Sequence, residues 1–331
     1  MKIIIFRCDR IGDFLLSSIL MNNMKKINNN IEFTLVCSKK NNYYVKNSFL
    51  VKNVLTMPDN FIKRIFFIFT FFKSKYDQCI VLDGKKYSIL SSIFLKSQNK
   101  ILLTNKKNYY KYLKVFFNKV FFSKKNTNKI DELILIASYL GIKLNLDSAK
   151  YENKIPHVDE SLIRLLDKIN NFTIFHFDEK WIYHQYINTY VNIEPKNDEL
   201  ISFFEKLLSK TNNDLIITTG RIESKLLLFL ISKFNKIKNN IYEYKYKGKS
   251  IFLIQKIDIH NLEFIISKSK CVITCHGATS HLSNMYNKKL LDIIDKSEEE
   301  LFNNWTFHFT NNSSLIREPF SDLTKKIIDN T

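Results

Sequence analysis

Two short segments of this chain carry polar side chains where a hydroxyl group or a phosphate could be bound. The first is the opening segment, in which the apolar run Ile3–Phe6 predicts a buried strand and is followed by a polar turn. Asp13 stands where the next residues take up helical periodicity, so we expect it at a helix N-terminus just beyond that strand. A carboxylate there can accept a proton from a sugar hydroxyl, or it can simply cap the helix.

The second segment is the turn between Cys275 and His281, which follows the apolar run Cys271–Thr274. The run predicts a buried strand, and the small residues after it predict a helix N-terminus that a diphosphate can approach closely. The histidines on either side of the small residues could hydrogen-bond the same ligand, although a lone histidine is more often structural. The candidate residues of this turn are His276, Gly277, Ala278, Thr279, Ser280 and His281.

Strand and helix patterns alternate through the rest of the chain, which indicates an α/β fold. Apolar runs of strand length stand at residues 31–37, 51–57, 76–82, 172–177, 214–219 and 290–294. Helical periodicity stands at residues 130–140, 161–169, 199–208 and 261–267. Residues 151–159, which include Pro156, carry no periodic pattern, so we expect a linker there and two domains, 1–155 and 156–331.

Two segments rich in aromatic residues have less certain structures. Phe61–Phe72 is compatible with either a helix or a strand. Tyr109–Phe122 has its polar residues on one narrow stripe, which predicts a helix that is either buried in the core or laid on a bilayer interface. Lys124 and Lys125, directly after it, would suit anionic lipid headgroups.

The charge of the chain is concentrated in its first half. The 331 residues carry a net charge of +19 and are 45% hydrophobic, which fits a folded protein of two domains. Residues 1–150 hold 27 Lys and Arg against 9 Asp and Glu, whereas the remaining residues hold 24 against 23. Drift in codon usage should act on both halves alike, so we expect an anionic partner: a membrane surface, an anionic acceptor or nucleic acid.

The five cysteines are scattered through apolar runs and form no CxxC pair, so we expect reduced, buried thiols rather than a zinc site. Arg7 interrupts the first apolar run after four residues, so we expect no signal peptide. The apolar run Ile65–Phe72 is too short to span a bilayer. These features predict a cytoplasmic protein that is soluble or peripheral to a membrane.

The opening residues DRIGDFLLSS resemble the start of the heptosyltransferase family, glycosyltransferase family nine, which adds sugars to lipopolysaccharide. Asp13 matches the aspartate of the family's Gly-Asp pair, which has been proposed as the catalytic base. The resemblance puts Arg10 and Gly12 on the acceptor side of the site. The strand YDQCIVLDG, residues 76–84, resembles a second family motif. Lys85 and Lys86 follow it and would offer a cation to an acceptor phosphate, or they are solvated surface lysines.

Three features of the second half resemble the family's donor site. Lys180, in the sequence Asp-Glu-Lys-Trp, resembles the lysine that contacts donor phosphates, and an ammonium there would stabilise a departing diphosphate. Glu223 resembles a glutamate that binds the donor ribose, although it could equally be a surface residue. Gly277 and His281 resemble the final strand-turn-helix signature.

The chain also departs from the family pattern in the donor half. His176 and Phe177 stand where the family has threonines, and Cys275 and His276 stand in place of the signature's acidic residue. The spacing from Gly277 to His281 is one residue longer than in the family. Because the family acid has been linked to donor-sugar hydroxyls, these differences leave the donor sugar open.

The resemblance as a whole implies a GT-B architecture, with two Rossmann-like domains facing across a cleft, the acceptor in the N-terminal one and the nucleotide sugar in the C-terminal one. It implies an inverting, metal-independent glycosyltransferase that uses the nucleotide sugar as substrate and no cofactor. It would act on a lipopolysaccharide or other cell-surface glycan at the inner face of the cytoplasmic membrane. Two alternatives are an inactive relative, since the donor-site acid is missing, and a basic nucleic-acid-binding protein. No RRM, KH or helix-turn-helix signature is visible, so we expect no nucleic acid partner.

Overall fold

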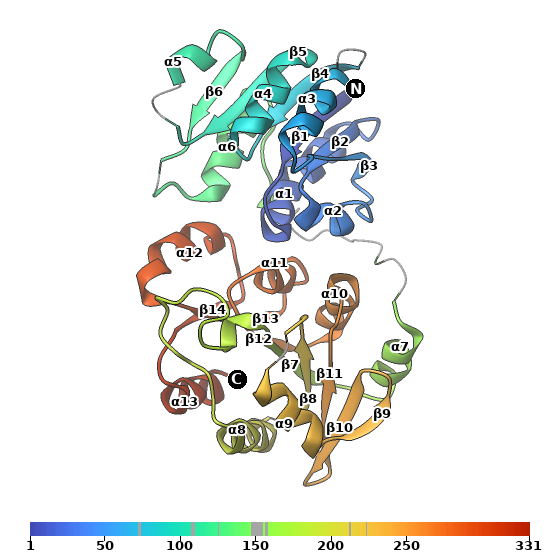
Figure 1. Ribbon diagram of the computed structural model, residues 1–331, viewed down its shortest axis with the longest axis vertical. Coiled ribbons are helices and arrows are strands. Elements are labelled where there is room, and N and C mark those ends of the chain that lie inside the picture. The colour runs from blue at the N-terminus through green and yellow to red at the C-terminus, as the bar shows by residue number, and fades with distance from the viewer. Residues whose placement is uncertain are drawn as a thin grey trace. The chain divides into compact units, whose positions relative to one another are not determined.

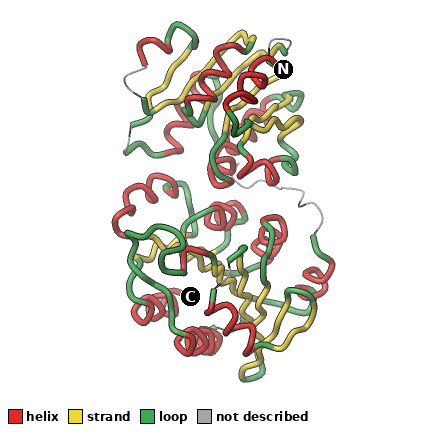
Figure 2. Tube along the Cα trace, in the orientation of Figure 1, coloured by secondary structure: helices red, strands yellow, loops and turns green. Residues whose placement is uncertain are grey.

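The computed structural model describes residues 1–71, 74–106, 110–124, 126–146, 155, 158–211, 213–222 and 224–331. The chain divides into two compact units, each an α/β domain built on one sheet (Figures 1 and 2). The N-terminal unit comprises Met1–Lys154 and Asn303–His308, and the C-terminal unit comprises Ile155–Phe302 and Phe309–Thr331.

The N-terminal sheet is fully parallel, with the strand order β3-β2-β1-β4-β5-β6. This is the order of a Rossmann fold, in which the strand order reverses between the first and fourth strands and ligands bind at the carboxyl ends of these strands. The strands are β1 Lys2–Arg7, β2 Glu32–Cys37, β3 Val51–Thr56, β4 Lys75–Val81, β5 Lys96–Thr104 and β6 Lys119–Phe122. The reversal here lies between β1 and β4, which are direct neighbours.

Helices cover both faces of this sheet. They are α1 Ile11–Ile27, α2 Lys39–Val45, α3 Phe61–Phe69, α4 Lys86–Phe94, α5 Tyr110–Leu113 and α6 Lys129–Tyr139. On one face, apolar side chains of the central strands, such as Phe6 and Val81, form a core with Phe71, Ile89 and Phe117 from the segments that carry α3, α4 and α5. All five cysteines of the chain are free and buried.

The C-terminal sheet repeats the Rossmann order and extends it at one edge. Its strand order is β14-β13-β12-β7-β8-β11-β10-β9, in which β10 runs antiparallel to both β9 and β11 and the other neighbours are parallel. The strands are β7 Phe172–Phe177, β8 Asp214–Thr219, β9 Asn235–Lys238, β10 Ile241–Tyr246, β11 Lys249–Ile254, β12 Cys271–Cys275, β13 Lys289–Ile294 and β14 Asn312–Ile316. The reversal lies between β7 and β12.

The helices of this unit are α7 Glu160–Leu166, α8 Asn197–Lys210, α9 Lys225–Lys233, α10 Ile259–Lys268, α11 Ala278–Met285 and α13 Phe320–Asn330, with the short 3-10 helices η3 Glu179–Trp181 and η4 Lys296–Glu298. Helix α12 Glu299–Thr306 begins in this unit, and its residues Asn303–Thr306 belong to the N-terminal one. Helices α8, α9 and α13 pack on a core rich in aromatic side chains. Phe175 of β7 is fully buried, and its ring centroid lies 4.6 Å from that of Trp181. The Trp181 indole also donates to the His176 carbonyl, which fixes the turn that follows β7.

The predicted α/β fold is confirmed, and the predicted strands at 172–177 and 214–219 match β7 and β8 at both ends. Phe61–Phe72, which the sequence left between helix and strand, contains the helix α3. The single helix predicted over Tyr109–Phe122 is wrong: Tyr109 lies outside the described residues, α5 ends at Leu113, and β6 pairs with β5. An apolar run of this kind can form either a helix or a strand. Residues 119–122 form a strand because they pair with the edge of β5. Among the residues that the structure describes, no helix is long and apolar enough to cross a bilayer.

Candidate active site

The N-terminal site is organised by Arg7, the last residue of β1, which is only 7% exposed. Its guanidinium donates to the Leu82 carbonyl at 2.9 Å, just after β4, and to the Asp13 carbonyl at 3.1 Å. Nη1 lies 3.3 Å from an Asp9 oxygen, and Nη2 lies 3.5 Å from Asp13 Oδ1. A buried guanidinium requires such partners. Arg7 therefore fixes two carboxylates at the carboxyl ends of β1 and β4.

Asp13 serves as a helix cap and also faces a cavity. Its Oδ2 accepts a hydrogen bond from the Arg10 backbone N–H at 2.9 Å, which is half of a capping box at the start of α1. Its side chain is nevertheless 14% exposed and lines two neighbouring cavities. The capping interpretation and the catalytic one are thus compatible with each other.

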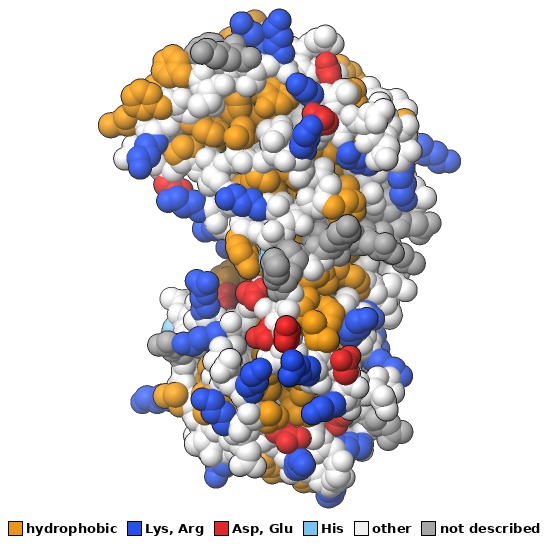
Figure 3. All heavy atoms as spheres, turned by 90° about the vertical axis from the view of Figure 1, so that its right-hand side faces the viewer, with side chains coloured by type: hydrophobic (Ala, Val, Ile, Leu, Met, Phe, Trp, Pro, Cys, Tyr) orange, Lys and Arg blue, Asp and Glu red, His pale blue; other side chains and the backbone are white. Residues whose placement is uncertain are grey.

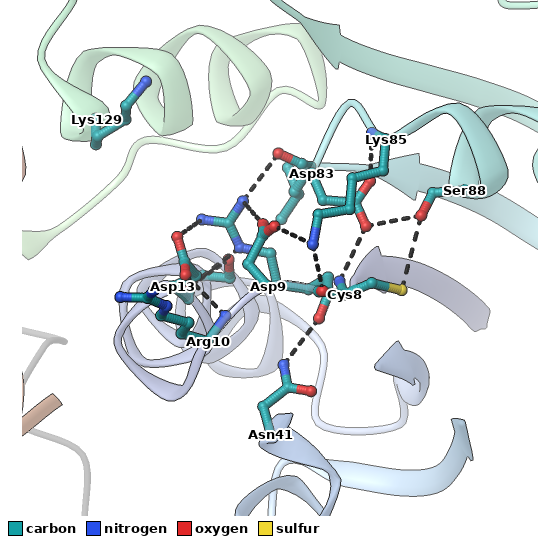
Figure 4. A network of polar contacts seen from close by, with 12 residues as sticks. Cys8, Asp9, Arg10, Asp13, Asn41, Asp83, Lys85, Ser88 and Lys129 are labelled. Atoms are coloured by element: carbon teal, nitrogen blue, oxygen red, sulfur yellow. Dashed lines mark hydrogen bonds and ion pairs between the residues drawn. The ribbon is translucent and has the colours of Figure 1, made fainter. Parts of the chain in front are cut away.

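The turn after β4 completes the carboxylate cluster (Figure 4). Lys85 Nζ lies 2.7 Å from Asp9 Oδ1 and donates to the Cys8 carbonyl at 2.5 Å. Asp83 accepts hydrogen bonds from the backbone N–H groups of Cys8 and Lys85 and from the Ser88 hydroxyl. Burial raises the pKa of Asp83, although these hydrogen bonds act in the opposite direction. The turn after β4 therefore joins acidic and basic side chains in one network with Asp9.

Asp9 and Asp13 line both cavities. The larger one has a volume of about 490 Å³ and is also lined by Asp59, which pairs with Lys39 at 2.8 Å. Five cationic side chains line it against these three carboxylates: Arg10, Lys39, Lys40, Arg64 and Lys85. The other is lined by Arg7, Asp83, Lys129 and Glu132 among others. A carboxylate beside a cationic pocket suits a substrate that carries both hydroxyl and phosphate or carboxylate groups.

The predicted acceptor residues have different surroundings in the structure. Arg10 and Lys85 line the larger cavity, but the Lys85 ammonium is already paired with Asp9. Gly12 is buried in the first turn of α1, and Lys86 is exposed at the start of α4. Arg7, Asp9, Lys39, Lys40 and Arg64 also line the cavities and were not predicted from the sequence to do so. Arg7 and Asp9 could have been found from their place in the polar turn between the first strand and Asp13, whereas Lys39, Lys40 and Arg64 come from other segments.

In the C-terminal unit, Lys180 and Gly277 meet at the carboxyl ends of β7 and β12. A Cβ atom added to Gly277 would lie 3.1 Å from Lys180 Nζ, so the ammonium would have to move by a few tenths of an ångström to make room for it. The ammonium forms an ion pair with the buried Asp178, whose carboxylate also caps η3 by accepting from the Lys180 backbone N–H. Burial alone would lower the pKa of Lys180, but the charge of Asp178 outweighs burial and raises it well above its usual value.

The turn after β12 is held by Asp292, a fully buried residue of β13 that the sequence analysis missed. His276 Nδ1 lies 2.6 Å from one of its carboxylate oxygens, and the Ser280 hydroxyl donates to the other at 2.7 Å. Ser280 also accepts from the Gly277 N–H at 3.1 Å and donates its own N–H to the Gly277 carbonyl. The Ser280 side chain therefore stabilises the turn, and the backbone of Ala278 and Thr279 forms the start of α11.

Two further residues predicted for the donor site are His281 and Glu223. The His281 ring is buried and packs edge-on against Phe309, with the ring centroids 5.4 Å apart. Glu223 lies outside the described residues. The structure adds Arg317, which donates to the Lys180 carbonyl at 2.8 Å and to the Val191 carbonyl at 3.1 Å. No sequence signal pointed to Arg317, because it follows β14, far along the chain from Lys180.

These two sites belong to a fold found in known sugar-modifying proteins. The structure resembles that of Escherichia coli heptosyltransferase WaaC with ADP, at 12% identity over all of both chains and a TM-score of 0.66. A glycosyl transferase family 9 structure from Veillonella parvula is 10% identical over 98% of this chain and 88% of its own, with a TM-score of 0.69. The UDP-GlcNAc 2-epimerase from Methanocaldococcus jannaschii is 11% identical over 99% and 92%, with a TM-score of 0.56.

These likenesses define the class: the chain has the GT-B fold, built from two Rossmann-like domains. The sequence itself matches no protein-family model and no curated protein. The predicted fold class is confirmed, and within it the structure resembles heptosyltransferases, as the opening motif had indicated.

The buried His176 should make the stability of the protein depend on pH. Burial lowers its pKa from the usual 6.5 to about 4, and its Nδ1 lies 2.9 Å from the Thr218 hydroxyl. Between these values the unfolded chain binds a proton that the folded chain does not, so stability is lost as the pH falls. From pH 7 to 5 this group should lower the free energy of unfolding by about 2 kcal/mol.

Urea titrations at both pH values test this expectation. His176→Gln, which retains a polar group toward Thr218, should remove about 2 kcal/mol of the measured decrease. The part due to His308, whose pKa burial also lowers to about 4, should remain. His184→Gln alters an exposed histidine and should leave the whole decrease unchanged. An equal decrease in wild type and His176→Gln would contradict the assignment.

Proposed function

We propose that this protein is a glycosyltransferase that moves a sugar from a nucleotide-sugar donor to an anionic glycan acceptor, such as lipopolysaccharide, with inversion and without a metal. The single observation that carries this proposal is the pair of sites at the two strand reversals. One combines the Asp13 carboxylate with a cationic cavity, and the other brings Lys180 against the Gly277 turn. The GT-B fold is the setting in which heptosyltransferases carry their sites.

In the proposed reaction, Asp13 takes the proton of an acceptor hydroxyl while the oxygen of that hydroxyl attacks the anomeric carbon of the donor. The bond from that carbon to the diphosphate breaks on the opposite face, so the configuration inverts. Arg7 would hold the Asp13 carboxylate in place through its two contacts with that residue. The cationic wall of the larger cavity would bind phosphates or carboxylates of the acceptor.

The leaving nucleoside diphosphate would be held in the C-terminal unit. The Lys180 ammonium would neutralise its developing charge, and the backbone N–H groups of Ala278 and Thr279 at the start of α11 would bind its oxygens. Asp292, through His276 and Ser280, would keep that turn in shape. His276 would then take the place of the acid that the family motif carries.

The fold by itself leaves the reaction open, because a UDP-GlcNAc 2-epimerase also has it. The cationic cavity next to Asp13 favours transfer, since an epimerase acts on its nucleotide sugar alone and has no need for a second, anionic substrate. We further propose that the protein acts at the inner face of the cytoplasmic membrane, because 18 of its 19 net positive charges lie in residues 1–150. Weak oligonucleotide binding beside strong nucleoside diphosphate binding would exclude the nucleic-acid alternative.

Asp13→Asn tests the catalytic base. The amide oxygen can still accept from Arg10, so the cap should survive, while turnover should fall by about two to four orders of magnitude. Nucleoside diphosphate affinity, measured by calorimetry, should stay near the wild-type value. Asp131→Asn, which changes an exposed carboxylate in the first turn of α6, is the matched control. Wild-type turnover, or unfolding instead of inactivation, would remove Asp13 from the mechanism.

Lys180→Met tests the donor site. Loss of an ionic contact with the diphosphate should weaken nucleoside diphosphate binding by about tenfold to a hundredfold. Gly277→Ala should weaken it too, because the new Cβ would press on the same ammonium. Lys233→Met, at an exposed position near the end of α9, should have no effect. Unchanged affinity in both site variants, with normal thermal unfolding, would contradict the donor assignment.

A further inference from the structure

Helix α3 presents an apolar stripe to the solvent. Ile62, Ile65, Phe66 and Phe69 follow the i, i+3, i+4, i+7 spacing that places side chains on one helical face. Their exposed fractions are 62%, 41%, 66% and 57%, and Phe61 beside them is 63% exposed. A helix on the surface of a globular domain ordinarily turns such a stripe toward the core. Helix α3 instead turns it toward the solvent.

The opposite face of α3 contacts the domain through half-buried side chains. Phe67 packs against the core, with its ring edge-on to Phe71 at a centroid distance of 5.0 Å. Arg64 donates to the Pro58 carbonyl at 2.6 Å, and its guanidinium lies 3.6 Å from the centroid of the Tyr87 ring. These contacts fix the rotation of the helix. The exposed stripe is therefore a consequence of packing on the other side.

The neighbouring helix α4 extends the same surface. Tyr87, Leu90 and Phe94 are 38%, 39% and 45% exposed and follow the i, i+3, i+7 spacing of one face. The α3–α4 surface, as we call it, consists of Phe61, Ile62, Ile65, Phe66, Phe69, Tyr87, Leu90 and Phe94. Figure 3 shows hydrophobic side chains gathered over one side of the N-terminal unit, with Lys and Arg side chains beside them.

The charges on α3 and α4 indicate which kind of partner the α3–α4 surface binds. Neither Phe61–Phe69 nor Lys86–Phe94 contains an acidic residue, and Lys63 and Lys86 are exposed on the two helices. Apolar and aromatic side chains bordered by lysines suit an anionic bilayer, where the apolar groups enter below the headgroups and the lysines meet the phosphates. A second copy of the chain would bring an equally basic unit to the same surface.

The surface also adjoins the candidate active site. Arg64 and Tyr87 join α3 to α4, and both line the larger cavity beside Asp9 and Asp13. A bilayer lying on the surface would hold the headgroup of a glycolipid close to the cationic wall of that cavity. The geometry therefore accounts for how an acceptor embedded in a membrane could reach this cavity.

We infer that the α3–α4 surface binds the face of an anionic phospholipid bilayer and inserts the apolar stripe of α3 below the headgroups. The delivery of a glycolipid acceptor rests on the proposed function, whereas lipid binding itself does not. The segment Tyr109–Phe122, predicted to form one helix in the core or on a bilayer interface, is not a single helix. Its residues Tyr112, Val115 and Phe116 are 73%, 81% and 50% exposed.

Co-sedimentation of the full-length protein with vesicles tests the inference. Wild type should bind vesicles of phosphatidylglycerol and phosphatidylcholine, bind phosphatidylcholine alone poorly, and dissociate as salt is added. The double variant Ile62→Gln/Phe66→Gln should bind the anionic vesicles at least about tenfold more weakly. The matched control Leu228→Gln/Ile237→Gln alters side chains in the C-terminal unit that are 68% and 51% exposed, and it should bind like wild type.

A fluorescence measurement gives a second, independent readout. In a Phe66→Trp variant the new indole should shift its emission to the blue on addition of anionic vesicles, while a Leu228→Trp variant should show no vesicle-dependent shift. Equal vesicle binding by wild type and the Ile62→Gln/Phe66→Gln variant would overturn the inference. A concentration-dependent dimer that this variant abolishes would assign the surface to a second copy instead.

The outcome is separable from that of the proposed function. The Ile62→Gln/Phe66→Gln variant should keep wild-type affinity for nucleoside diphosphates and wild-type turnover of a detergent-free, soluble acceptor fragment. Vesicle binding without any sugar transfer by the wild type would contradict the proposed function and support the membrane surface. Sugar transfer without vesicle binding would support the proposed function and contradict the membrane surface.

Discussion

The N-terminal site depends on one buried cation. Arg7 closes β1 with a charge that is almost fully removed from solvent, and such a charge is tolerated only when its partners are close and well directed. Its partners are the Leu82 carbonyl, the Asp13 carbonyl and the carboxylates of Asp9 and Asp13. The need to satisfy Arg7 therefore draws the ends of β1 and β4 and the start of α1 together, and it orients both acids.

In the C-terminal unit the buried charge is an anion instead of a cation. Asp178 is the buried charge, and its principal ionic partner is the Lys180 ammonium, which becomes the cation of the candidate donor site. Arg317 secures the same turn through the Lys180 carbonyl. One strand along, Asp292 secures the Gly277 turn through His276 and Ser280.

The two units share a strand order but differ in what they expose. The C-terminal unit extends its sheet with the antiparallel strands β9 and β10, whereas the N-terminal unit leaves the apolar stripe of α3 in solvent. That exposure costs favourable burial, and the contacts of Phe67 and Arg64 maintain it. A basic domain with such a surface beside its candidate acceptor cavity is consistent with substrates presented at a membrane.

The sequence by itself determined the local features: buried strands such as β7 and β8, the turn that carries Asp13, and the small-residue turn at Gly277. Each depends on neighbours along the chain, through side-chain periodicity and cap chemistry. Tertiary structure alone decided the rest, because the partners lie far apart in the sequence. Arg317 reaches Lys180, Asp292 reaches His276, and Arg64 reaches the cavity of Asp13 only after the sheets form. The same holds for β6, which the edge of β5 selects, and for α3, whose exposed side is set by what packs on the other.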